Sequence, residues 1–236
     1  MKRNILGGVL LMTLLGLIVS VWFLFQKGSI LFRPIQSYVM LTDIEYVKAT
    51  EIDAVMDSYL GLSFWDVDLE KIQSILTRLD WVSSALVKRS WPDKLYVSLY
   101  EQKPVARWGE SGLVNHEGAV FYPKNLTGFS NLVTLNGQLS ESSSLLLALS
   151  AFQKELNKIQ FTVSFLTRQL DGVWRISLHN GSQIIVESQG SEDKLGVFVK
   201  AYPKLSKALR KSPQIYDLRY SNGFIVGKSV SQNSPE

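Results

Sequence analysis

The sequence contains no cysteine and only two histidines among its 236 residues. Without cysteine, disulfide bonds, thiolate nucleophiles and thiolate metal sites are excluded. His116 and His179 both stand beside turn glycines, which favours solvated turn positions over catalytic bases. Asp66 and Asp68 are close in sequence, but Asp68 is better placed as a helix cap. The HExxH, GxSxG, P-loop and GxGxxG motifs are also missing. These absences predict a chain that is not an enzyme and holds no metal and no cofactor.

A concentrated positive charge is missing as well. The formal net charge is +4, from 25 basic and 21 acidic residues. Lys2, Arg3 and Lys27 lie in the first 29 residues, which hold no acid, and the remainder has 22 basic and 21 acidic residues. The short basic run at 204–211 is typical of a solvated helix face. Nucleic acid is therefore not an expected partner, because its binding requires a basic face.

One long apolar run is present near the N-terminus. Ile5 to Phe25, with Leu14 near its middle, is 21 residues without a charge. As a helix it would span ~31 Å, close to the ~30 Å hydrocarbon thickness of a bilayer. The alternative is a cleaved signal peptide, but the run exceeds the apolar core of a signal and no A-x-A site follows. We expect a transmembrane helix over 5–25, preceded by a short cytoplasmic tail, 1–4. Lysine and arginine on both flanks leave the orientation open.

The next stretch, about 30–105, predicts a small domain of order β-α-α-β-β. Its expected elements are a strand over 35–47, a helix opened by Thr50 with Asp53 as a loose capping box and ended by Gly61, a helix capped by Asp68, and strands over 82–89 and 95–101. In the last strand Leu95, Val97 and Leu99 alternate with polar and aromatic residues, which indicates one buried face.

A specific motif lies across this stretch. It includes Trp81-Val82, then Val87-Lys88-Arg89-Ser90-Trp91-Pro92-Asp93-Lys94-Leu95, then Glu101 to Trp108 with Pro104 and Ala106. This order and spacing resembles the POTRA domain of the FtsQ/DivIB cell-division family. For Trp81, Trp91 and Trp108 we expect core and hairpin packing, and a sugar-stacking surface is the alternative.

Residues 106–228 predict a second, mixed α/β domain. We expect short strands near 105–108, 113–115, 119–121 and 132–137, followed by a helix from Ser142 or Ser143 to 157. Strands are then expected over 161–167, 173–178 and 183–187, with a hairpin turn at Asn180-Gly181 between the last two. The chain should end in a helix over 192–211, interrupted by Pro203 and with Leu209 among its inward residues, and a terminal strand segment 215–226. The polar tail 229–236 is expected to be disordered. The predicted fold class is α+β, with a mainly antiparallel sheet in this domain. The terminal "D-L-R-Y" segment again resembles the FtsQ/DivIB family.

The resemblance covers 1–228 and implies a function. It implies a non-catalytic, single-pass type II protein of the cell inner membrane, with its body in the periplasm at the division septum. It implies protein partners, namely FtsB and FtsL, which are periplasmic coiled-coil division proteins, and other divisome proteins. On this reading the chain links early and late division proteins for septum assembly, and binds no small-molecule substrate.

The terminal segment suggests how a partner would bind. An edge strand presents unpaired backbone groups, to which a partner segment can add as a further strand. The predicted partner-binding residues are Arg219, Tyr220, Ser221, Asn222 and Gly223. Tyr220 would be an aromatic anchor, Arg219 would pair with a partner carboxylate, and Asn222 and Gly223 would allow close backbone approach. The alternative for Tyr220 is a strand residue packed on the protein's own helix.

Two other functional classes stay open at this point. POTRA domains also occur in protein-transport or chaperone components of the envelope, but these normally carry a β-barrel or several POTRA repeats. A membrane-anchored cell-wall enzyme would need a reactive constellation of side chains, which the sequence does not offer.

Overall fold

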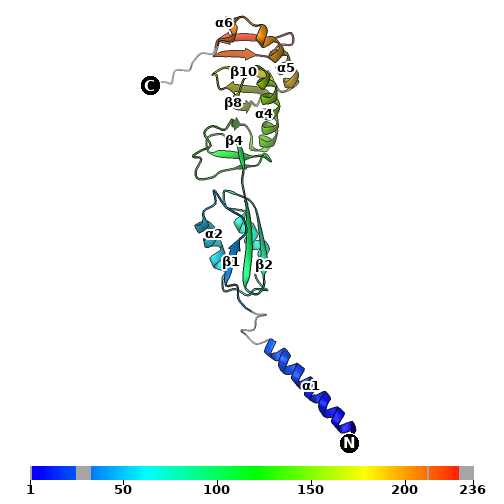
Figure 1. Ribbon diagram of the computed structural model, residues 1–236. Helices are drawn as coiled ribbons and strands as arrows, with labels where there is room; N and C mark the ends of the chain where they lie inside the picture. Colours follow the sequence, from blue (N-terminus) through cyan, green and yellow to red (C-terminus); the bar gives the residue numbers. More distant parts are fainter. Residues whose placement is uncertain (1, 25–32, 212, 229–236) are drawn as a thin grey trace. The chain divides into compact units, whose positions relative to one another are not determined.

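The computed structural model describes residues 2–24, 33–211 and 213–228 (Figure 1). Helix α1 (Lys2–Leu24) contains Ile5 and Leu14, whereas Phe25 and the predicted tail 229–236 lie outside the described residues. Within the described part of the chain, no helix meets the combined length and apolarity needed to cross a membrane. The chain divides into two compact units between Gln102 and Lys103. We call 33–102 the first domain and 103–228 the second domain.

The first domain has the predicted β-α-α-β-β order. Its elements are β1 (Ser37–Met40), α2 (Ala49–Met56), the 3-10 turn η2 (Asp57–Tyr59), α3 (Leu69–Leu76), β2 (Val82–Ser90) and β3 (Lys94–Glu101). They form a three-stranded sheet of order β1-β3-β2, in which β1 is parallel and β2 antiparallel to β3. The alternating pattern of β3 buries Leu95, Val97 and Leu99 against Ile72 and Leu76 of α3, as expected.

Several local predictions in the first domain are confirmed and others are wrong. Asp68 caps α3, accepting a hydrogen bond from the Lys71 amide at 3.0 Å. Gly61 has a positive φ of 82°, but it does not end the helix, because α2 ends at Met56 and the extended Leu60 closes η2. The strand predicted over 35–47 is only Ser37–Met40, because the Thr42 hydroxyl bonds both the amide and the carbonyl of Leu99 and replaces backbone pairing. Thr50 does not open α2, since the N-cap position is Lys48 without a side-chain cap.

The three motif tryptophans differ in their environment. Trp108 is buried, and Trp81 stacks on Tyr46 with ring centroids 4.3 Å apart, so the packing prediction holds for both. It is wrong for Trp91, which is 56% exposed. Trp91 stands in the turn between β2 and β3, beyond the last paired residues Ser90 and Lys94, where neither sheet nor helix covers it.

Other motif residues hold the first domain together. The Arg89 guanidinium donates to the backbone carbonyls of Phe64, Trp65 and Val67, and so fixes the loop before α3. The Glu101 carboxylate accepts from the amides of three consecutive residues, 45–47, at 2.7–2.9 Å. The motif is therefore largely structural at these positions.

The second domain is built on one mixed sheet. Its elements in chain order are β4 (Pro104–Trp108), β5 (Gly112–Asn115), β6 (Val120–Phe121), β7 (Thr134–Asn136), η3 (Leu139–Glu141), α4 (Ser142–Leu156), η4 (Asn157–Ile159), β8 (Val163–Arg168), β9 (Val173–Leu178), β10 (Gln183–Glu187), α5 (Ser191–Ala201), η5 (Tyr202–Lys204), α6 (Lys207–Arg210), β11 (Gln214–Asp217) and β12 (Ile225–Lys228). The nine strands have the order β12-β11-β10-β9-β8-β7-β4-β5-β6. Antiparallel pairs outnumber parallel ones, five to three, in line with the predicted mainly antiparallel sheet.

Helices α4 and α5 pack on each other beside the sheet (Figure 1). Phe152 and Leu156 of α4 join Leu195 and Phe198 of α5 in one hydrophobic core with the inward residues of the strands. Phe198 also contacts the ring of Tyr216 on β11, with centroids 4.9 Å apart. This core therefore extends along the sheet to β11, the strand next to the edge strand β12.

The second domain also corrects three predictions. Neither Ser142 nor Ser143 caps α4: the N-cap position is Glu141, and the Ser142 hydroxyl donates to the Gly118 carbonyl at 2.7 Å. The helix predicted over 192–211 ends at Ala201, and Pro203 lies in the 3-10 turn that follows, so the predicted interruption is confirmed. Leu209, predicted to face inward, is 41% exposed because α6 is a separate short helix.

Candidate partner-binding site

Strand β12 is one edge of the nine-stranded sheet. It pairs antiparallel with β11, from Asp217↔Ile225 to Gln214↔Lys228, and among the described residues no strand pairs with its other side. The opposite edge, β6, has only two residues. An edge strand leaves alternate N–H and C=O groups free to pair with an added strand. The sheet therefore presents a four-residue open edge at β12.

The segment before β12 is fixed at both ends. At its start, Leu218 is buried and its amide donates to the Ile185 carbonyl at 2.8 Å. At its end, the Phe224 ring meets Phe198 edge to face, with centroids 5.1 Å apart. We call 218–224 the β11–β12 loop. Because its two ends are packed on the core, its exposed middle is held in place without a partner.

All five predicted site residues lie together in the middle of this loop. Arg219, Tyr220, Ser221, Asn222 and Gly223 are each exposed. Tyr220 is 51% exposed, and Ile225, the first residue of β12, is 52% exposed. The structure thus places the tyrosine in the loop that leads into the edge strand. The predicted terminal strand segment 215–226 is divided in two, because the loop separates β11 from β12.

Arg219 pairs with a carboxylate of its own chain. Its Nε donates to both oxygens of Asp217, at 2.9 and 3.1 Å, and its Nη2 donates to Oδ2 at 2.6 Å. This hydrogen bonding lowers the pKa of Asp217, and the same pairing raises the pKa of Arg219. A partner carboxylate would therefore meet a guanidinium that is already partly neutralised.

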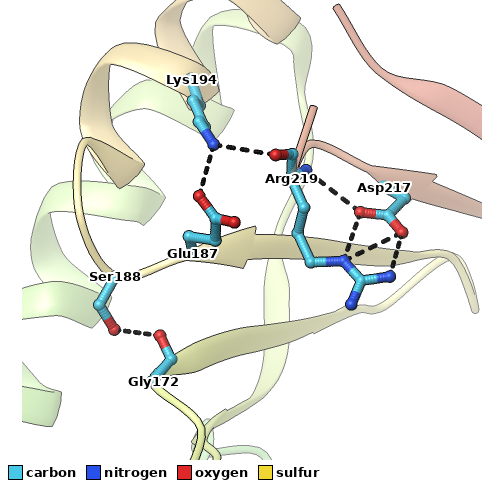
Figure 2. Close-up of polar contacts among 6 residues, drawn as sticks. All are labelled: Gly172, Glu187, Ser188, Lys194, Asp217 and Arg219. Atoms are coloured by element: carbon cyan, nitrogen blue, oxygen red, sulfur yellow. Dashed lines mark hydrogen bonds and ion pairs between the residues drawn. The ribbon is translucent and has the colours of Figure 1, made fainter. Parts of the chain in front are cut away.

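Lys194 of α5 fixes the start of the loop to the sheet. Its Nζ donates to Glu187 Oε2 at the end of β10, at 2.8 Å, and to the backbone carbonyl of Arg219, at 3.2 Å. Figure 2 shows this bridge beside the Asp217–Arg219 pair, with Ser188 bonded to the Gly172 carbonyl nearby. One lysine therefore connects a helix, a strand end and the exposed loop.

A pocket of about 220 Å³ lies between this loop and α5. Its lining includes Val197 and Asp193 of α5 together with Tyr220 and Phe224. Val197 is 58% exposed although it is apolar. The sequence analysis missed the contribution of α5, and an apolar residue at an outward position of that helix was the one available signal.

Over the described ranges, no three histidine, aspartate or glutamate residues converge in a way that could hold a metal ion. His116 and His179 are both exposed at turns, as predicted. Burial raises the pKa of Tyr216, which keeps the phenol neutral, and its hydroxyl donates to the Leu209 carbonyl at 3.3 Å. What the geometry offers is a backbone edge and an aromatic side chain beside a small pocket.

The fold and this edge define a class of protein: a POTRA-type domain followed by a mixed-sheet domain with an open edge strand. The model of the FtsQ-type POTRA domain matches residues 36–102, and the model described as Cell division protein FtsQ/DivIB, C-terminal, matches 106–219. The chain belongs to the FtsQ/DivIB family of cell division proteins. The second match ends at Arg219, so β12 and residues 220–224 of the loop lie outside it.

Curated relatives are similar in sequence to this chain over most of its length. Each of the following is named Cell division protein FtsQ. The Xanthomonas campestris pv. campestris protein is 32% identical over 188 residues, covering 80% of this chain and 67% of that protein. The Shewanella oneidensis protein is 31% identical over 202 residues, covering 84% and 76%. The Coxiella burnetii protein is 27% identical over 225 residues, covering 95% and 91%.

Proposed function

We propose that this chain is a non-catalytic scaffold of the division septum, which binds FtsB and FtsL by strand addition at β12. The single observation that carries the proposal is the open edge at β12, which directly follows an exposed loop with fixed ends. A partner strand would pair with the backbone of β12. Tyr220 would supply a side-chain anchor beside the pocket on α5, and Ser221, Asn222 and Gly223 would lie against the partner backbone.

We further propose that α1 anchors the chain in the inner membrane as a single-pass type II protein, with both domains in the periplasm. The uncharged run Ile5–Phe25 supports this, because its length suits a bilayer. Large apolar side chains from Leu11 to Trp22 are exposed along α1, Leu14 among them at 60%. A helix that is apolar on all sides is suited to a membrane or to a buried core. A protein-transport role is less well supported, because the matching POTRA model is the FtsQ type.

The test of the docking edge compares two tyrosines. Tyr220→Ala should weaken binding of the periplasmic segment of FtsB by about 2 kcal/mol, roughly 30-fold, as truncation of an aromatic hot spot does. The thermal unfolding midpoint should stay unchanged, because the Tyr220 side chain is half exposed. Binding would be measured by titration calorimetry on the full chain in nanodiscs.

Tyr122→Ala is the matched control. Tyr122 is 53% exposed, in the same domain, and directly follows β6 at the opposite edge of the sheet. This variant should bind FtsB as the unmodified chain does. Equal affinity for the Tyr220→Ala chain and the unmodified chain would remove Tyr220 from the site.

A further inference from the structure

The two exposed tryptophans that follow α1 lie at one end of the first domain. Trp65 is 54% and Trp91 56% exposed, whereas Trp108 and Trp174 are buried and Trp81 is half-buried. Leu62, near Trp65 in the loop before α3, is 45% exposed. Single exposed apolar residues are ordinary on a protein surface, but two exposed tryptophans with a leucine need an explanation.

Backbone contacts bring the segments that carry these three residues to the same end of the first domain. The Ile35 amide donates to the Leu62 carbonyl at 2.9 Å, and the Gln36 amide donates to the Asp93 carbonyl at 2.8 Å, so the loop and the β2–β3 turn flank the entry to β1. Because Ser37 pairs with Lys94, β1 begins beside that turn. We call Leu62, Trp65 and Trp91 the entry patch, because the chain enters the first domain there.

Charged groups surround the entry patch. Lys94 is exposed at the start of β3, and Arg33 is half-exposed, with its guanidinium 3.5 Å from Asp93. Arg89 donates to the Trp65 carbonyl at 3.1 Å, and two exposed acids, Asp66 and Asp68, follow that tryptophan. Tryptophan, lysine and arginine side chains close together are typical of protein surfaces that lie at a membrane–water interface.

The length of the chain restricts what can cover the patch. Nine residue steps separate Leu24, the end of α1, from Arg33, so their Cα atoms lie at most about 32 Å apart. We propose that Leu62, Trp65 and Trp91 rest on the phospholipid surface of the membrane that holds α1. This inference rests on the proposed anchor, because α1 would keep the patch within reach of lipid. The contact would fix which end of the first domain faces the bilayer.

The absence of cysteine permits a direct test. A Leu62→Cys variant of the full chain carries one thiol, which can be labelled with an environment-sensitive fluorophore after reconstitution into phosphatidylcholine vesicles containing nitroxide lipids. Quenching at position 62 should be at least about twofold stronger than at Leu170→Cys, a control in the second domain that is 93% exposed. Adding Trp65→Ala and Trp91→Ala to the Leu62→Cys chain should reduce quenching to the control level.

A third label separates this inference from the anchor. In Leu14→Cys, strong quenching by deep nitroxide lipids is expected if α1 lies in the bilayer. Quenching at 14 but only control-level quenching at 62 would overturn the lipid contact and leave the anchor standing. No quenching at 14 would overturn the anchor and this inference with it. Efficient dimer formation when the unlabelled Leu62→Cys chain is treated with a mild oxidant, together with control-level quenching of the labelled chain, would assign the patch to a second copy of the chain and contradict the proposal.

Discussion

Arg219 is engaged by a carboxylate of its own chain. Its bidentate pair with Asp217 lies at the junction between β11 and the exposed loop. The sequence indicated only a free cation next to a tyrosine, because nothing in "D-L-R-Y" shows that Asp217 and Arg219 meet. We therefore expect Arg219 to shape the loop as well as to face a partner.

This pair predicts a pH dependence. The pKa of Asp217 is lowered from its ordinary value of 3.8, chiefly by the Arg219 side chain. A carboxyl whose folded-state pKa is depressed adds stability that is complete above the unfolded value and is lost as the pH falls through the folded one. Arg219→Ala should therefore lower stability at pH 7, and the difference from the unmodified chain should shrink as the pH falls below 3.8.

Urea unfolding of both chains between pH 2.5 and 7 would check this expectation. Arg219→Lys is the comparison variant, because it retains a charge but not the bidentate geometry, and should recover part of the difference. The account of Arg219 fails if the free energies of unfolding of the unmodified and Arg219→Ala chains differ by the same amount at every pH in this range. The effect should be small, because the Arg219 side chain is 48% exposed and solvent screens the pair.

At the scale of elements, regular patterns could be read from the sequence and long-range contacts could not. The alternation of Leu95, Val97 and Leu99 was sufficient to predict the buried face of β3, and Asp68 was sufficient to predict the start of α3. In both cases the residues that decide the structure are close in sequence. The early end of β1 depends on Thr42 meeting Leu99, 57 residues away, and no local pattern contains that pairing. The same is true of the site, where residues 219–223 were predicted but the loop that holds them and the wall supplied by Val197 of α5 were not.

The segment between β1 and α2 depends on one carboxylate. Glu101 Oε1 accepts from the amides of Tyr46 and Val47, and Oε2 accepts from that of Glu45. Glu101→Ala would leave these amides without the carboxylate and should destabilise the first domain by about 1–3 kcal/mol. Stacking of Tyr46 on Trp81 should loosen as well, since the same segment carries that tyrosine.

Thermal unfolding and amide hydrogen exchange at 45–47 would measure this effect. Glu101→Gln retains the Oε1 acceptor and should cost less than Glu101→Ala, with slower exchange at 46 and 47 than at 45. An unchanged unfolding midpoint together with unchanged exchange in Glu101→Ala would refute the structural role given to this motif residue.

At the scale of the whole molecule, the two domains have separate hydrophobic cores. The core of the first domain is centred on residues such as Met56 and Ile72, and that of the second on residues such as Leu135 and Phe198. A substitution in one core should therefore affect mainly its own domain. The proposed partner edge lies on the second domain and the proposed lipid contact on the first, so each surface can be changed alone.

The most direct measurement of the central claim is hydrogen exchange of the β12 amides, Ile225 to Lys228, in the full chain held in nanodiscs. On saturation with the periplasmic segment of FtsB, the amides of β12 that point away from β11 should slow at least about tenfold. The amides of Val120 and Phe121 at the opposite edge should exchange as before. If FtsB binds and the β12 amides exchange at their original rates, strand addition at this edge is wrong.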